Sequence, residues 1–386
     1  MGDVTAAAVA PVQTPAEIRR ARYLGITYLL LAVLVLWLFA FGSMDYEHAT
    51  WGLARANDPV LWGGVEEVSF SASGLSFVVA GLMATAGGVQ LWRGFGKWSS
   101  VVLAVALVLF ILAFLAWATA RSSQGSFSMV GMLQATVLRS VPITFGALSG
   151  VLCERVAVIN IAIEGMLLGG AFVAVVVGSS IKVAEDYLIL GAPVGSWIGV
   201  GVAMLSGAIL AWALAVLAIR YRVDQIIVGV VINIFVLGLT SFLSLRILVE
   251  NPDFNKAAIF KALQIPGLSR IPLIGPILFA HNIFVYAMFV LVAVLTFGLF
   301  RTRWGLRARA VGEHPKAADT LGINVYRMRY LNVLLGGLVA GFGGAYFTVG
   351  SVGRFDENMT NGRGFIGLAA MIFGRWHPVG AMACKS

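Results

Sequence analysis

Long apolar stretches alternate with short polar loops along most of the chain. A helix needs about 20 mainly apolar residues to cross the hydrocarbon core of a bilayer. Stretches of this kind lie at residues 23–42, 73–92, 99–118, 129–151, 156–178, 194–219, 225–249, 281–300 and 330–350. A tenth apolar stretch begins near Gly364. The pattern predicts an all-α polytopic transmembrane helix bundle with nine or ten spans.

The composition excludes several other classes of protein. Of the 386 residues, 59% are hydrophobic and only 12% are charged, about half the charge density of an ordinary soluble domain. A soluble enzyme, a disordered tail protein and a nucleic-acid-binding protein are all excluded. The net charge of +9 reflects Lys and Arg residues gathered in alternate loops, which is the pattern of loops that stay on the cytoplasmic side. The N-terminus is therefore expected to be cytoplasmic, and the charge needs no anionic partner.

No cofactor, metal or nucleotide site is visible in the sequence. Cys153 and Cys384 are too few for a disulfide scaffold, and the four histidines are far apart without an H-E-x-x-H pattern. The only candidate for a P-loop, Gly96-Lys97, does not match the P-loop pattern, because Trp98 follows where Ser or Thr is required. The chain is therefore expected not to be an enzyme, and any ATP hydrolysis must come from another subunit.

Small residues recur at every fourth position in several predicted spans. Such spacing lets helix backbones approach closely within a membrane. The longest ladder is Gly199, Ala203, Gly207, Ala211 and Ala215, and another is Gly337, Gly341 and Ala345. These ladders predict seams of tight helix packing.

The polar loop at residues 301–329 differs from the other loops. Four arginines open it, namely Arg301, Arg303, Arg307 and Arg309. Pro315 suits the first turn of a short helix over residues 316–321, and Gly322 suits its C-terminal end. A short helix on a basic stem could contact a cytoplasmic partner. An ordinary charged loop near lipid headgroups is the alternative.

Polar side chains are rare within the predicted spans. Because they are costly in a bilayer, they usually face the bundle interior or a water-filled path. The candidates are Gln134, Arg139, Asn160, Glu164 and Asn233. Their amides would suit a neutral, polyhydroxylated solute on a translocation path, whereas structural hydrogen bonds between helices are the other interpretation. Arg139 and Glu164 could pair, because each would otherwise be an isolated buried charge.

Four segments resemble one family of membrane proteins. They read LRSVPITFGALSGVLCERVAVINIAIEGMLLGGAF at 138–172, VDQIIVGVVINIF at 223–235, GLRARAVGEHPKAADTLGINV at 305–325 and GRGFIGLAAMIFGRWHPVGA at 362–381. These segments are similar to the permeases of ATP-binding-cassette (ABC) importers in the branched-chain amino acid, ribose and nucleoside class, and most of all to nucleoside permeases. The resemblance covers most of residues 138–381 and is weaker over residues 1–130.

The resemblance implies a permease subunit of the cell membrane that moves nucleosides or simple sugars inward by alternating access. It implies three protein partners besides membrane lipid: an ATPase subunit with two nucleotide domains, an extracytoplasmic solute-binding lipoprotein and a second permease. The short helix of the loop would dock against the ATPase, with Ala317 and Ala318 small because the helix lies close to it. The position-matched contact residues are Glu313, Pro315, Lys316, Ala317, Ala318, Asp319, Leu321 and Gly322.

The same comparison suggests a domain organisation. Residues 1–22 are expected to be a mobile cytoplasmic tail, residues 23–128 extra spans, and residues 129–386 the permease core. Similar permeases continue beyond the position of Ala381, so a C-terminally truncated core is expected. Two other functions stay open. An ion-gradient secondary transporter would show paired discontinuous helices and an intramembrane acid cluster, and a truncated chain could be an inactive permease or scaffold.

Overall fold

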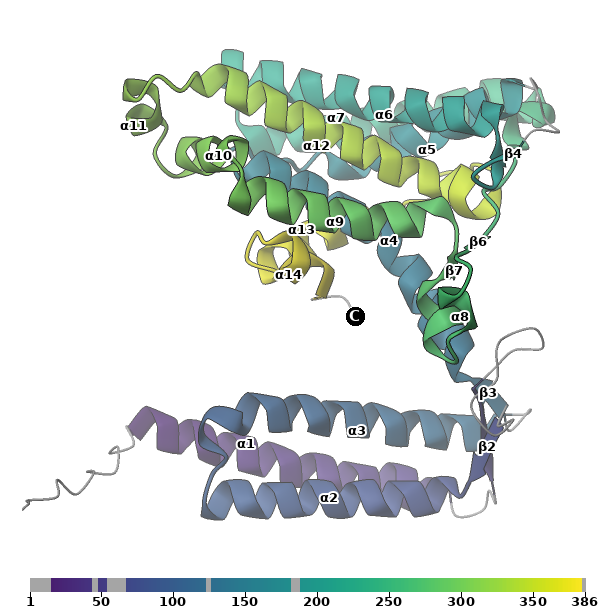
Figure 1. Cartoon of the computed structure of the whole chain (residues 1–386), viewed down its shortest axis with the longest axis vertical. Coiled ribbons are helices and arrows are strands. Elements are labelled where there is room, and N and C mark those ends of the chain that lie inside the picture. The colour runs from purple at the N-terminus through teal and green to yellow at the C-terminus, as the bar shows by residue number, and fades with distance from the viewer. Residues whose placement is uncertain (1–14, 44–47, 54–66, 123–125, 182–187, 384–386) are drawn as a thin grey trace, which may run out of the picture. The chain divides into compact units, whose positions relative to one another are not determined.

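The protein is described by a computed structural model that covers residues 15–43, 48–53, 67–122, 126–181 and 188–383 (Figure 1). Nine helices within these ranges are long and apolar enough to cross a membrane. The expected all-α polytopic bundle is therefore confirmed. The chain forms two compact units, residues 1–131 and 132–386, and the first corresponds to the part that resembles the family weakly.

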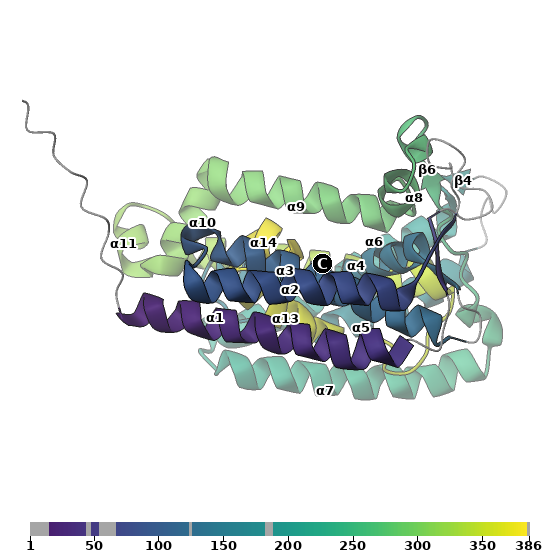
Figure 2. The same ribbon diagram turned by 90° about the horizontal axis from the view of Figure 1, so that it is seen from below.

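The first unit contains three long helices (Figure 2) and a small sheet. The helices are α1 (Pro15–Leu34, continued by a π-helical segment Val35–Ala40), α2 (Ala72–Trp92) and α3 (Ser99–Ala120). The strands β1 (Ala49–Gly52), β2 (Glu67–Phe70) and β3 (Ser126–Ser128) have the order β2-β1-β3, with β2 antiparallel and β3 parallel to β1. Of the expected tail, residues 15–22 form the first turns of α1, and residues 1–14 lie outside the described ranges.

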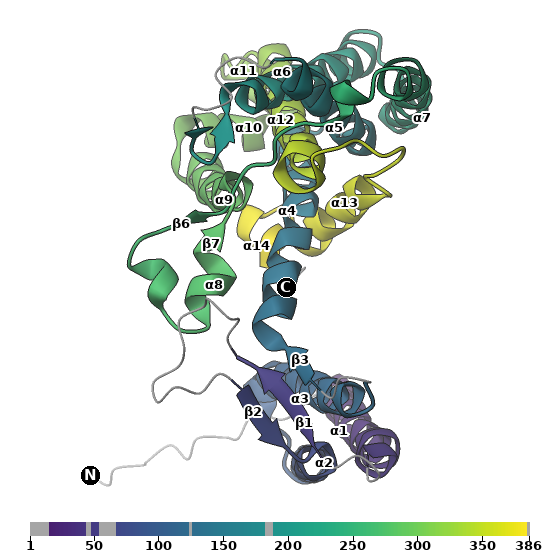
Figure 3. The same cartoon turned by 90° about the vertical axis from the view of Figure 1, so that its right-hand side faces the viewer.

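The second unit is built around six long helices, which Figure 3 shows from one side. These are α4 (Met129–Glu154), α5 (Ile163–Ser180), α6 (Val194–Ala215), α7 (Gln225–Leu243), α9 (Ile283–Arg301) and α12 (Val325–Phe347). The shorter helices are α8 (Ile274–Leu278), α10 (Arg303–Glu313), α11 (Pro315–Thr320), α13 (Arg363–Phe373) and α14 (Pro378–Ala383). Two short antiparallel pairs complete the unit, β4 (Leu188–Ile189) with β5 (Ala192–Pro193) and β6 (Leu263–Gln264) with β7 (Ala280–His281). π-helical segments extend α6, α7 and α12 over Val216–Arg220, Ser244–Val249 and Thr348–Val352.

Helices α5, α6 and α12 pack side by side at the centre of the second unit (Figures 1 and 3). A Cβ atom on Gly207 of α6 would overlap the carbonyl oxygen of Gly337 on α12. In the same way, a Cβ atom on Gly341 would overlap the carbonyl oxygen of Ala203. The backbones therefore touch along the predicted ladders, which confirms these ladders as packing seams.

Two parts of the second unit differ from the sequence-based expectation. The predicted span at 156–178 is broken, because α5 begins only at Ile163 and the preceding residues are not α-helical. Side chains of α7 hold this unwound stretch: Gln225 Oε1 accepts the N–H of Ile159 at 2.6 Å, and Asn233 Nδ2 donates to the carbonyl of Ile161 at 2.8 Å. The basic tract after residue 301, for which no helix was predicted, forms the helix α10.

Candidate coupling helix and intramembrane polar site

The loop between α9 and α12 is folded into two helices with defined ends. The side chain of Thr302 caps α10, where its Oγ1 accepts the N–H of Gly305 at 3.3 Å. His314 separates the two helices and caps α11 through Nδ1, which accepts the N–H of Ala317 at 3.2 Å. Gly322 follows α11 with φ of +78°, a conformation that favours glycine. The predicted short helix, with Pro315 in its first turn and Gly322 just beyond its end, is confirmed.

The side chains of α11 divide into an inner and an outer set. Ala318 is only 2% exposed and belongs to the apolar core of the chain's own helices. The expectation that Ala318 is small in order to fit a partner is therefore wrong, because its methyl group faces inward. The neighbours Lys316, Ala317 and Asp319 are exposed, and Leu321 is 80% exposed. The outer set combines the apolar side chain of Leu321 with the charged side chains of Lys316 and Asp319.

Glu164 lies in the first turn of α5 and binds the beginning of α13. Its Oε1 accepts the hydroxyl of Thr360 at 2.6 Å and the N–H of Gly362 at 2.8 Å, while Oε2 accepts the N–H of Gly364 at 2.6 Å. The carboxylate is 8% exposed. A negative charge is favourable at a helix N-terminus, where several N–H groups lack intrahelical partners. Glu164 therefore joins two helix starts within the bundle.

The prediction that Arg139 could pair with Glu164 is wrong. Within the described part of the chain Arg139 makes no ion pair with Glu164, and its side chain is exposed on α4. Instead of a cation, Glu164 has the hydroxyl of Thr360 and the N–H groups of Gly362 and Gly364 as partners. Gln134 also lies on α4 and is half-buried.

Asn160, Glu164 and Asn233 gather where the chain unwinds before α5. Asn233 Oδ1 accepts the N–H of Gly165 at 2.7 Å, so together with its bond to Ile161 this amide holds both sides of the break. Asn160 is fully buried, and its Nδ2 contacts Cys153 Sγ at 3.5 Å. Asn160 precedes α5, so it does not share a helix face with Glu164.

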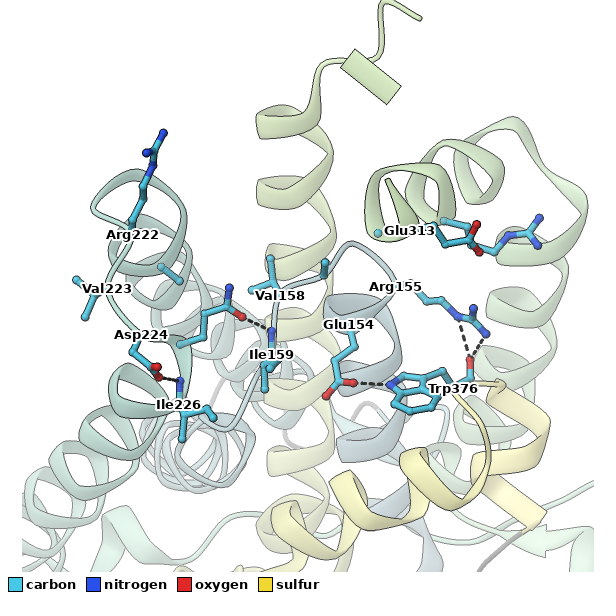
Figure 4. A pocket seen from close by; sticks show the side chains of 15 residues that line it. Glu154, Arg155, Val158, Ile159, Arg222, Val223, Asp224, Ile226, Glu313 and Trp376 are labelled. Atoms are coloured by element: carbon cyan, nitrogen blue, oxygen red, sulfur yellow. Dashed lines mark hydrogen bonds between the residues drawn. The ribbon is translucent and has the colours of Figure 1, made fainter. Parts of the chain in front are cut away.

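A pocket of about 740 Å³ opens between α10, the α6–α7 turn and the turn after α13 (Figure 4). At its edge the indole N–H of Trp376 donates to Glu154. The Arg155 guanidinium donates from Nε at 3.1 Å and from Nη2 at 2.7 Å to the carbonyl of Trp376. Burial is the main reason why the pKa of Arg155 is lowered, and the positive charge of nearby Arg309 lowers it further. The negative charge of Glu313 raises this pKa. The sequence did not single out Glu154, Arg155 or Trp376, although these residues lie in two of the family-like segments.

This architecture is that of a multi-pass membrane protein with a folded helical loop and buried polar clamps between its spans. Residues 132–384 match the family described as "Branched-chain amino acid transport system / permease component". The chain is 38% identical over 255 residues to the guanosine ABC transporter permease protein NupQ of Bacillus subtilis (strain 168), covering 65% of this chain and 77% of NupQ. It is also 38% identical over 250 residues to the nucleoside ABC transporter permease protein NupC of Lactococcus lactis subsp. cremoris (strain MG1363), covering 64% and 76%. No solved structure matches the chain significantly.

The chain therefore belongs to this permease family, as the resemblance predicted. It is the transmembrane permease component of an ABC transporter, and hence a transporter subunit and not an enzyme. The same assignment places it in the membrane as a multi-pass protein. Membership of this family excludes the alternative function of an ion-gradient secondary transporter.

Proposed function

We propose that the chain is a permease subunit that imports nucleosides and is driven by a separate ATPase that binds α11. The exposed outer side of α11 carries this proposal. Leu321 exposes 80% of its surface, and the charged residues Lys316 and Asp319 of α11 are exposed as well. An apolar anchor framed by polar groups is typical of the centre of a protein interface. Caps at both ends of α11 hold this anchor in one orientation.

The contact with the ATPase is proposed to use Glu313, Pro315, Lys316, Ala317, Asp319, Leu321 and Gly322. Ala318 supports them from beneath, because it packs into the permease core. The loop would then lie in the cytoplasm, as would the N-terminus. The ATPase, with two nucleotide domains, would supply the hydrolysis for which this sequence has no P-loop. Residues 129–386 would form the transport core, with residues 23–128 as accessory spans.

Nucleosides are the proposed solutes because two relatives are named for guanosine and nucleoside transport. A solute-binding lipoprotein outside the cell would deliver the solute, and a second permease would complete the path. A neutral nucleoside has many hydrogen-bonding groups and no charge, so amides such as those of Asn160 and Gln134 suit its path better than an ion site. Simple sugars share this chemistry and are the alternative solutes.

Reconstitution tests this proposal. Proteoliposomes containing both permeases and the ATPase should take up radiolabelled guanosine only when ATP and the binding protein are present. Leu321→Arg should abolish ATPase binding in a pull-down, since it places a charge at the apolar anchor. Leu188→Arg is the matched control, because Leu188 is also exposed but lies on β4, at the other end of the unit from α11 (Figure 1). Uptake that needs a sodium or proton gradient, or equal ATPase binding by both variants, would contradict the proposal.

A further inference from the structure

The turn between α13 and α14 has a strained backbone. Arg375 and Trp376 adopt φ of +55° and +53° in succession. This left-handed region is unfavourable for residues other than glycine, because the Cβ atom comes too close to the following carbonyl oxygen. A non-glycine residue keeps such a conformation only where its surroundings enforce it. The contacts that hold this turn therefore identify what controls its conformation.

Two adjacent residues at the end of α4 hold the turn (Figure 4). Glu154 accepts the indole N–H of Trp376, and Arg155 donates two hydrogen bonds to the carbonyl oxygen of the same residue. The side chain and the main chain of Trp376 are thus both fixed by neighbouring residues. A planar guanidinium that donates twice sets an orientation as well as a distance, which a lysine ammonium cannot reproduce.

Arg155 is also in direct contact with α10. A Cβ atom on Gly312 of α10 would overlap the carbonyl oxygen of Arg155, so the two backbones touch. The guanidinium carbons of Arg155 and Arg309 lie 5.4 Å and 5.2 Å from the centre of the Phe300 ring. The ring of His377, one residue after Trp376, stacks on Phe300 with a centroid distance of 4.7 Å. Phe300 therefore joins α10, the end of α4 and the strained turn.

Helix α10 continues directly towards α11. The N–H of His314 donates to the carbonyl of Ala310 on α10 at 3.0 Å, while the side chain of His314 caps α11. His314 thus joins α11 to α10, and α10 in turn contacts Arg155. At the other end of α13, Glu164 binds the helix start. The α13–α14 hairpin is therefore anchored by Glu164 at one end and touches the α10 network at the other.

We propose that Arg155, Phe300 and Trp376 are positioning residues that transmit movement of α10–α11 to the α13–α14 hairpin during transport. The inference rests on the proposed function in one respect, namely that the ATPase moves α11. When Arg155 no longer binds Trp376, the strained turn relaxes and the α13–α14 hairpin changes its position. When the contact forms again, the hairpin returns to its first position. The turn then acts as an element with two arrangements, which mechanical coupling between sites requires.

Conservative variants of the assembled transporter test this. Arg155→Lys keeps the charge but loses the paired hydrogen bonds, and Trp376→Phe keeps an aromatic ring but loses the indole N–H. Both variants should bind the ATPase as the unchanged permease does, and the ATPase should hydrolyse ATP at the same rate in all three transporters. The number of solute molecules imported per ATP should fall roughly tenfold, within the usual range of coupling between sites. Arg246→Lys is the matched control, because Arg246 forms an exposed ion pair with Glu250, and it should leave this ratio unchanged.

A reversible lock provides a second measurement. Phe300→Cys and His377→Cys are combined with Cys153→Ala and Cys384→Ser, and the two new thiols are joined by a short disulfide-containing crosslinker. The joined transporter should bind the ATPase but not import solute, and reduction should return import only to the lower level of the same variant before crosslinking, because Phe300→Cys itself removes a positioning residue. Full import by the joined protein, or an unchanged import-to-ATP ratio in both conservative variants, would overturn the inference. If the unchanged permease never bound the ATPase, the proposed function would fail instead, and the inference with it.

Discussion

Glu164 accepts a 2.6 Å hydrogen bond from the backbone N–H of Gly364, which lies 200 positions further along the chain. The helix that starts there, α13, has only 11 residues, so it is too short to cross a bilayer. Its first N–H groups lie within the protein, where the lack of water makes an unpaired group costly. The carboxylate supplies the missing acceptors. The lone acid of α5 thus stabilises a short helix within the bundle.

Loss of this carboxylate should destabilise the second unit. Glu164→Ala removes three acceptor contacts, and hydrogen bonds to charged groups contribute about 1.5–3 kcal/mol each. We expect a lower thermal unfolding midpoint in detergent and a large loss of uptake, with Glu164→Gln intermediate. Glu250→Gln removes an exposed carboxylate and should have little effect. A normal unfolding midpoint for Glu164→Ala would show that the clamp does not stabilise α13.

The seam between α6 and α12 should not accept side chains. Gly207→Leu places atoms where the carbonyl of Gly337 lies, so the helices must separate and the bundle should fail to fold. Gly201 lies on the same helix with open space around its would-be Cβ atom, so Gly201→Leu should fold normally. The monodisperse fraction in size-exclusion chromatography measures the difference. Equal fractions for the two variants would contradict the packing.

Asn233→Ala should act through stability more than through solute choice. Both polar atoms of the Asn233 side chain are bound to backbone groups of the α5 start. Each group left unpaired costs about 1–3 kcal/mol. We expect a lower unfolding midpoint and an equal fractional loss of uptake for different nucleosides. A variant of normal stability with altered preference among nucleosides would place Asn233 on the translocation path instead.

Two adjacent alanines of α11 should respond differently to the same substitution. Ala318→Trp forces a large ring into the core, and overpacking of this kind costs about 1–3 kcal/mol or more. The unfolding midpoint of the permease should therefore fall. Ala317 is exposed, so Ala317→Trp should leave stability unchanged and block binding of the ATPase. The pair separates burial within the permease from contact with its partner, and equal destabilisation would contradict the assignment of inner and outer sides.

The stability of the β6–β7 region should depend on pH through His281. Its ring is buried with Nε2 2.7 Å from the carbonyl oxygen of Ile277, and burial lowers its pKa below the ordinary value of 6.5. Below pH 6.5 the unfolded chain binds a proton that the folded chain does not. The contribution of His281 to the free energy of unfolding is therefore fully present above pH 6.5, and it decreases as the pH falls towards the lowered pKa. His281→Gln should reduce this decrease when unfolding midpoints are compared between about pH 8 and pH 5. An identical slope in both proteins would exclude His281 as its source.

The sequence by itself determined the approximate positions of the long spans, because about 20 apolar residues in a row have few other stable environments than a bilayer. It also located α11, since Pro315 and Gly322 act on the backbone locally. The packing ladder on α6 was equally readable, because small residues at a fixed spacing face one way on any helix.

Only the tertiary structure decided which groups meet across long separations. Gln225 and Asn233 bind the backbone of Ile159 and Ile161, in a stretch that is apolar enough for a helix but is unwound. Glu164 binds the start of α13 and not Arg139, and Ala318 faces inward although its neighbour Ala317 faces outward. The clamp of Glu154 and Arg155 on Trp376 also spans more than 200 positions. Local propensity and periodicity act over a few residues, whereas these contacts depend on how the helices pack.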